Sequence, residues 1–104
     1  MAEKKYVYMV KKIYQYDPRP YDDEDIVETV TIYNSFEKGV KAIQKEYEKK
    51  IKSPDLEMKG IEINEEEQKV EAYVTMQTYK STYDVYRQYD WYLTREELKW
   101  KNKN

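Results

Sequence analysis

Residues 29–49, TVTIYNSFEKGVKAIQKEYEK, decide the fold, because a β-branched run gives way to an amphipathic helix within a few residues. The alternating start of this stretch is typical of a strand. Asn34 and Ser35 are both good helix N-caps, and Asn34 with Glu37 has the spacing of a capping box. The apolar residues that follow recur at helical spacing and share one face: Phe36, Val40, Ile43, Tyr47 and Ile51. A helix with one such stripe can cover one face of a sheet.

The rest of the chain alternates in the manner of β-strands. Five segments are expected as strands, two before the helix and three after it: residues 6–16, 26–33, 56–63, 69–79 and 82–93. The turn Asn64–Gln68 closes a hairpin, and Gly60 interrupts its strand as a β-bulge would. Thr94 and Glu97 have capping-box spacing, so a short C-terminal helix is predicted over about 94–101.

The predicted fold class is therefore α+β, as one domain over residues 1–104. The order ββαβββ predicts a two-layer sandwich, with an antiparallel sheet of about five strands packed on one main helix. A chain of 104 residues is too short to divide into two halves that each hold a core.

Tyrosine dominates the apolar composition, with 13 Tyr against one Phe. In the first strand Val7, Met9 and Ile13 share one phase, which we assign to the core. The other phase then lies on the opposite face and holds four phenols: Tyr6, Tyr8, Tyr14 and Tyr16. A Tyr ring can cover apolar area while its hydroxyl stays in water, and aromatic residues are enriched in binding hot spots. The phenols bind a partner, stack on nucleic-acid bases, or merely dress an open sheet face or fill a second small core.

Composition excludes several kinds of chemistry. The chain has no Cys and no His, which excludes disulfides, thiol nucleophiles, zinc sites of the Cys/His type and Ser-His-Asp catalysis. There is no glycine-rich phosphate loop, and no acid lies in an apolar run that would desolvate it. The acids at 22–25 are consecutive and lack the ligand spacing of a calcium loop. We therefore expect no catalytic residues, no metal site, no cofactor and no enzyme.

No segment predicts membrane insertion or export. No apolar run approaches the ~20 residues of a membrane span, and the start MAEKK lacks the apolar core of a signal peptide. A soluble, cytoplasmic protein is the expectation.

Charge is balanced overall but segregated along the chain. The 19 Lys and Arg against 21 Asp and Glu give a net charge of −2. Residues 17–29 carry six acids and one Arg, residues 62–71 carry five acids and one Lys, and residues 37–52 carry six Lys and three Glu. Such polarity can steer a charged partner. The lysines of the helix leave nucleic-acid association open, although interleaved glutamates argue against a continuous phosphate track.

The segment 29–49 resembles a pattern of small uncharacterised phage and bacterial proteins, in which a strand leads into a capped helix and then a hairpin. The matching residues are Ile32, Tyr33, Ser35, Glu37, Lys38, Val40 and Ile43. Gly39 stands where that pattern usually has Ala. The resemblance implies a ββαββ core and a mobile-element source, and small accessory proteins of that kind often occlude a larger host machine.

The function predicted from these features is that of a non-catalytic protein-binding module. In its concrete form, it is a phage or mobile-element accessory protein that inhibits a host defence enzyme by stoichiometric binding, in the manner of an anti-CRISPR protein. The predicted contacts are aromatic residues of two strands with the acids beside them: Tyr6, Tyr8, Tyr14, Tyr16, Tyr21, Asp22, Asp23, Glu24, Asp25, Tyr86, Tyr89, Trp91 and Tyr92. The alternatives are a nucleic-acid-associated protein that uses the Lys-rich helix face, and a self-associating structural protein. A homodimer is compatible with the protein-binding function, and no membrane contact is expected.

Overall fold

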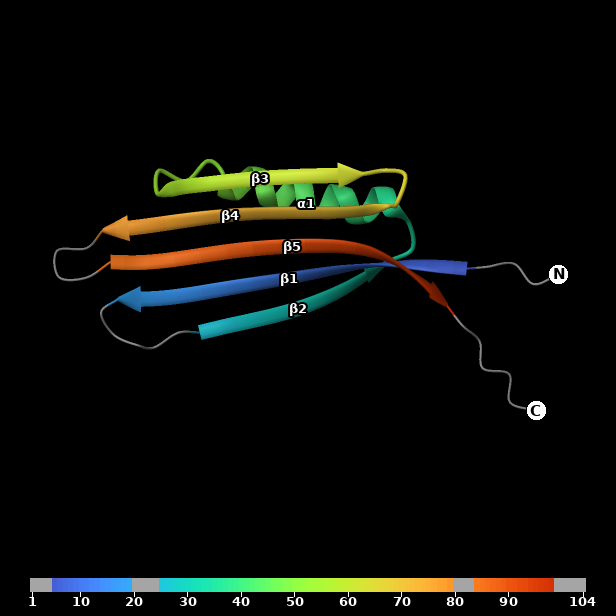
Figure 1. Cartoon of the computed structure of the whole chain (residues 1–104), viewed down its shortest axis with the longest axis horizontal. Helices are drawn as coiled ribbons and strands as arrows, with labels where there is room; N and C mark the ends of the chain where they lie inside the picture. The colour runs from blue at the N-terminus through green and yellow to red at the C-terminus, as the bar shows by residue number, and fades with distance from the viewer. Residues whose placement is uncertain (1–4, 20–24, 80–83, 99–104) are drawn as a thin grey trace.

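The computed structural model describes residues 5–19, 25–79 and 84–98. It shows an α+β fold in which one helix lies against a five-stranded antiparallel sheet of order β2-β1-β5-β4-β3 (Figure 1). The elements are β1 (Lys5–Arg19), β2 (Asp25–Tyr33), α1 (Phe36–Lys50), β3 (Leu56–Asn64), β4 (Lys69–Tyr79) and β5 (Asp84–Leu98). The sequence-based start of the helix and the boundaries of β2, β3 and β4 are confirmed to within two residues.

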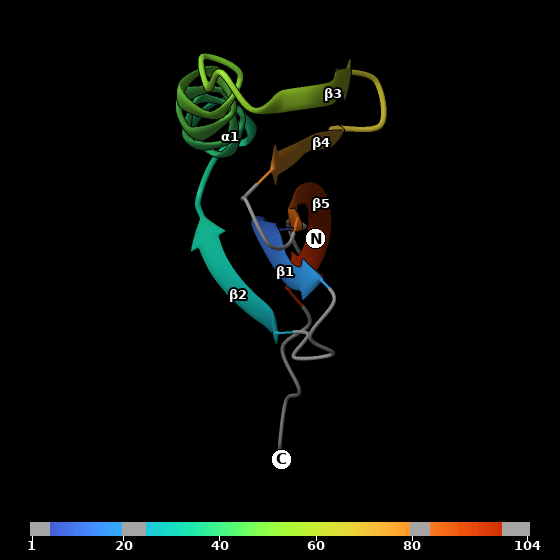
Figure 2. The ribbon, with the colours of Figure 1, turned by 90° about the vertical axis from the view of Figure 1, so that its left-hand side faces the viewer.

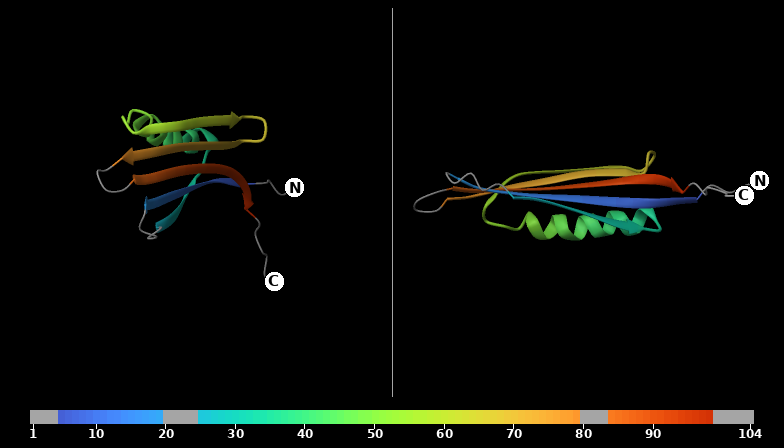
Figure 3. Two further views of the ribbon diagram at one scale, coloured as in Figure 1. Left: turned by 60° about the vertical axis from the view of Figure 1, so that its left-hand side comes forward. Right: turned by 90° about the horizontal axis from the view of Figure 1, so that it is seen from below.

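Helix α1 links the two edges of the sheet, since it follows β2 and precedes β3. Its N-cap is Ser35, whose hydroxyl accepts a hydrogen bond from the Lys38 N–H at 3.2 Å. Glu37 in the first turn and Lys49 and Lys50 in the last complement the helix dipole. The whole helix lies on one side of the sheet (Figures 2 and 3).

The core lies between α1 and the three inner strands. Ile43 and Tyr47 of the helix are buried against the inward phases of β4 and β5. The largest of the fully buried side chains is Trp91, which is 1% exposed. The apolar stripe of the helix is thus confirmed, and the phases of β4 and β5 that hold Val70 and Trp91 face it.

The expected faces of β1 are wrong. Val10 is the buried residue of β1, and Tyr8 and Tyr14 of the same phase pack against the core, so the tyrosine phase lies on the helix side. Met9 and the other residues of its phase lie on the side of the sheet away from the helix. Alternation separates the two phases of a strand but cannot say which is inward when both are apolar.

The length of the sheet explains why tyrosines face the helix. A helix of 15 residues spans ~22 Å, whereas a strand of 15 residues spans ~50 Å. The strands therefore run past the helix (Figure 3). Large rings fill the space near the helix ends: Tyr8 lies 6.2 Å from Phe36, and Tyr14 stacks on Tyr89 at 4.7 Å between ring centroids.

The predicted C-terminal helix is also wrong. Residues 94–98 continue β5 and pair with β1, from Thr94 opposite Met9 to Leu98 opposite Lys5. A ladder of backbone hydrogen bonds to a long neighbouring strand outweighs the local preference of a capping box. Residues 99–101, the remainder of that prediction, lie outside the described part of the chain.

Gly60 does not form the expected bulge, because the register shift of β3 lies between Leu56 and Met58. Gly60 instead lies opposite Tyr73, and a Cβ built on it would stand 2.5 Å from the Tyr73 Cε1 atom. The missing side chain thus gives the Tyr73 ring a place on the sheet, as when an aromatic residue covers a cross-strand glycine.

Candidate functional site

The surface of the sheet opposite α1 is covered by no other element of the described chain, and we call it the open face. Strand register fixes which side chains share it. One row across the sheet consists of Val30, Lys11, Tyr92, Glu71 and Glu62. The next row consists of Glu28, Ile13, Asp90, Tyr73 and Gly60. Alternate residues of the inner strands point the other way and are buried beneath the helix, which confirms the side to which these rows belong.

Apolar side chains gather on the open face over β1 and β2. Ile26, Val30 and Ile32 of β2 are exposed, and Met9 and Ile13 of β1 are partly exposed beside them. An apolar group of this kind on two adjacent strands is a feature of surfaces that bind other proteins.

The open face is also acidic. In the two rows, four carboxylates stand against one lysine. Glu62 and Glu71 lie directly opposite each other on β3 and β4, a pairing of like charges that weakens a sheet. Lys69 of the same face interacts with both carboxylates, and a positive group from outside would offset more of this repulsion.

Two groups at the centre of the face have raised pKa values, and burial is the main cause of both. Burial raises the pKa of the Asp90 carboxyl, and the hydrogen bonds from the Gln88 amide at 3.0 and 3.3 Å offset only part of this effect. The pKa of the Tyr92 hydroxyl is raised by burial and then by the charges of Asp90 and Glu71. The centre of the face therefore disfavours further negative charge.

Tyr92 stands between two shallow depressions of the open face. One has a volume of about 360 Å³ and is lined by Gly60, Glu62, Glu71 and Tyr73 among others. The second, of about 390 Å³, is lined by Met9, Lys11, Ile13, Thr94 and Glu96 with Tyr92. The face is thus an aromatic ridge with an acidic hollow on one side and a more apolar hollow on the other.

On the helix side, Glu46 joins the two layers of the fold. Its carboxylate accepts a hydrogen bond from the Trp91 indole N–H at 3.0 Å and forms an ion pair with Lys12 at 2.8 Å. Burial alone would raise the pKa of this carboxyl, but the hydrogen bonds from Lys12 and Trp91 and the charges of Lys12 and Lys50 lower it overall. This contact orients the helix over the sheet.

Most of the predicted contact residues belong to that covered side. Trp91 and Tyr89 are buried in the core, and Tyr8 and Tyr14 pack against it, so their expected placement on an open surface is wrong. Their rings are the largest apolar groups available, and the interior takes them. Tyr6 and Tyr16 share the phase of Tyr8 and Tyr14.

Two predicted contacts, Tyr86 and Tyr92, do lie on the open face, in register with Gln77 and Glu71. Tyr86 donates a hydrogen bond to Gln88 at 3.1 Å. Tyr21, Asp22, Asp23 and Glu24 lie outside the described residues, and for Asp25 only the backbone is described. The structure therefore retains two members of the predicted site and leaves the acidic loop untested.

Sequence reasoning missed Met9, Tyr73 and the pair Glu62 and Glu71. A sequence signal was present for Tyr73 and Glu71, because Val70, Ala72, Val74 and Met76 form one apolar phase of β4 and leave its other phase to face outward. Glu62 then follows from its place opposite Glu71 in the hairpin. Met9 was missed because it was assigned to the core.

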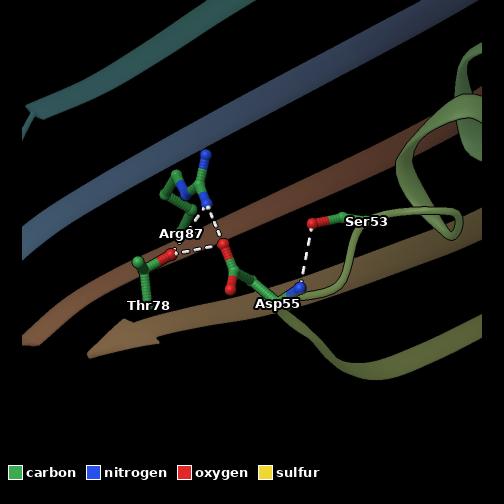
Figure 4. Close-up of polar contacts among 4 residues, drawn as sticks. All are labelled: Ser53, Asp55, Thr78 and Arg87. Carbon is green, nitrogen blue, oxygen red and sulfur yellow. Dashed lines mark hydrogen bonds and ion pairs between the residues drawn. The ribbon is translucent and has the colours of Figure 1, made fainter. Parts of the chain in front are cut away.

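A polar cluster fixes the entry into β3 (Figure 4). The Arg87 Nη2 donates to Asp55 Oδ2 at 3.4 Å and to Thr78 Oγ1 at 3.0 Å, and the Thr78 hydroxyl donates to the same Asp55 oxygen at 2.8 Å. The Asp55 N–H donates to Ser53 Oγ at 3.1 Å. The cluster connects the segment after α1 to β4 and β5, and its role is structural.

Comparison with known proteins gives no family: no family model, curated protein or solved structure matches this chain. The resemblance of residues 29–49 to small phage proteins stays a prediction. Among the described residues, no helix is long and apolar enough to cross a membrane, and no three acidic side chains gather closely enough to hold a metal ion.

Proposed function

We propose that this chain is a non-catalytic protein-binding module whose open face docks on a basic, partly apolar protein surface. In its concrete form it is a phage or mobile-element accessory protein that blocks a host defence enzyme by one-to-one binding. The observation that carries the proposal is the open face itself, an exposed apolar group beside two central rows that hold four carboxylates and one lysine.

The charge of the face favours a partner with a positive surface. Charge complementarity steers encounter and suppresses wrong partners, and Arg and aromatic side chains carry much of the binding energy of interfaces. Defence nucleases hold nucleic acid in positively charged channels. An acidic protein face with an aromatic ridge could cover such a channel and exclude its substrate.

The face does not suit a second copy of itself. In a two-fold interface each patch meets its own image, so two acidic faces would bring like charges together. Exposed tyrosines are compatible with either partner, but the carboxylates favour one of opposite charge.

The test is protection of a phage from an RNA-guided defence nuclease in a bacterium that expresses this protein, over a panel of such nucleases. The wild type should restore plaque formation with at least one, and the purified pair should elute as a one-to-one complex. The double variant Glu62→Lys and Glu71→Lys should lose both effects, since it reverses the charge of the acidic hollow.

The matched control is the double variant Lys41→Glu and Lys45→Glu, which reverses the charge of two exposed positions on the outer face of α1. It should protect as the wild type does. No protection by the wild type across the panel would refute the defence role. Loss of protection in the control but not in the open-face variant would refute the assignment of the face.

A further inference from the structure

The two edges of the sheet differ in how they are protected. The β3 edge has a register shift between Leu56 and Met58, and it carries Lys59 and Gly60 in its middle. Bulges and charged residues are the usual devices that stop an edge strand from pairing with another chain. The β3 edge is therefore protected against pairing with a strand of another chain.

The β2 edge is less protected within Asp25–Tyr33. Its register with β1 is unbroken over nine residues, and it contains no Pro, no Lys and no Gly. Between its ends, Glu28 is the one charged residue among six β-branched ones. Its apolar side chains are exposed on both faces of the sheet: Ile26 is 60%, Val27 51%, Val30 46% and Ile32 61% exposed. A long, regular, apolar edge of this kind is a template for strand pairing.

We propose that β2 pairs with β2 of a second copy of this chain, antiparallel and about a two-fold axis at Thr29. The two sheets then join into one sheet of ten strands. This inference goes beyond the proposed function and does not depend on it.

The sequence of β2 favours a second copy of this chain as the partner that pairs with this edge. Centring the pair on Thr29 places Asp25 opposite Tyr33 and uses all nine residues of the strand. Ile26 then faces Ile32 of the second copy, and Val27 faces Thr31, both favourable cross-strand pairs. Each of these pairs occurs twice about the axis, as in any isologous contact.

Charge fixes the register. Centred on Thr29, Glu28 faces Val30 of the second copy, and no like charges stand directly opposite each other. A pair centred on Glu28 would place the two carboxylates face to face, which is destabilising. The axis is perpendicular to the sheet, so both helices lie on the same side and the two open faces become continuous.

The test is the mass of the full chain in solution, measured by sedimentation equilibrium from low micromolar to near millimolar concentration. The wild type should pass from monomer to dimer over this range. A wild type that stays monomeric at the highest concentration overturns the proposal.

Two variants of one residue then identify the edge. Val30→Glu places a carboxylate opposite Glu28 of the second copy at two symmetric positions, whereas Val30→Lys places an ammonium there. The dimer dissociation constant of the Glu variant should exceed that of the Lys variant by about tenfold.

Within one copy the effect has the opposite sign, because Val30 lies opposite Lys11 of β1. The Glu variant should therefore unfold at a higher temperature than the Lys variant when both are monomeric, and poor folding cannot explain its weaker dimer. Equal dissociation constants for the two variants, or a tighter dimer for the Glu variant, would place the contact elsewhere and overturn the proposal.

Discussion

Replacing Glu46 tests how the helix is held on the sheet. Its carboxylate is the acceptor for the indole N–H of Trp91, which is 1% exposed, and it pairs with Lys12. In Glu46→Ala the indole loses its partner, and a hydrogen bond to a charged group contributes about 1.5–3 kcal/mol. The ion pair adds less than about 1 kcal/mol, since both side chains are about a third or more exposed to water. We expect a loss of about 2–3 kcal/mol in the free energy of unfolding.

Glu46→Gln is the matched control, because its amide oxygen can still accept the indole hydrogen bond. It should lose only about 1 kcal/mol, through the missing charge. Urea unfolding followed by circular dichroism measures both variants, and an unchanged dependence on urea concentration would confirm a pure stability effect. Equal stability of Glu46→Ala and the wild type would refute the proposed anchoring of the helix, as would equal losses in the two variants.

The same carboxylate makes stability depend on pH. The folded pKa of Glu46 lies below its ordinary value, so the unfolded chain binds more protons in acid. The stability that this group contributes is complete above the ordinary pKa of 4.5 and is lost as pH falls through the lowered folded value. In a titration of stability from neutral pH into acid, Glu46→Gln should show a shallower decline than the wild type.

Three further variants probe other parts of the account. Gly39→Ala places a Cβ 2.5 Å from Leu93 Cδ1, and Leu93 is fully buried. We expect overpacking to destabilise the fold by about 1–3 kcal/mol, which exceeds the gain of about 1 kcal/mol from helix propensity. A melting temperature above that of the wild type would contradict this. Gly60→Ala meets the Tyr73 ring at the same 2.5 Å, but that ring is exposed and can swing outward, so its thermal midpoint should fall less than that of Gly39→Ala. Burial raises the pKa of Asp90, so its charge is unfavourable in the folded state at neutral pH; Asp90→Asn should raise the melting temperature at neutral pH and weaken binding of a basic partner, and a lower melting temperature would count against this.

The sequence predicts most of the architecture because its local signals are consistent with one another. The β-branched run, the N-cap at Ser35 and the stripe through Ile43 and Tyr47 all indicate one strand followed by one helix. The hairpin turn after Asn64 is predicted for a similar reason, and the Asn64 side chain accepts from the Glu67 N–H at 2.9 Å.

What could not be predicted depends on contacts between distant segments. The two phases of β1 are both apolar, and its inward phase is decided by Trp91 and Leu93 of β5, some 80 residues along the chain in register with Lys12 and Val10. Thr94 begins a capping box, but pairing with β1 overrides it. The two faces of β1 are the opposite of those predicted, so Met9 and Ile13 lie on the open face in place of its tyrosines. The residues of the candidate site differ from the predicted ones for this reason.

The tyrosines that face solvent define where the binding face lies, and hydroxyl-radical footprinting with mass spectrometry identifies them in the free protein. Tyr92 and Tyr73 of the open face should label readily, whereas Tyr47 and Tyr89 between helix and sheet should be protected. Strong labelling of Tyr89 with protection of Tyr92 would mean that the helix covers the other side of the sheet, and the proposed binding face would not exist.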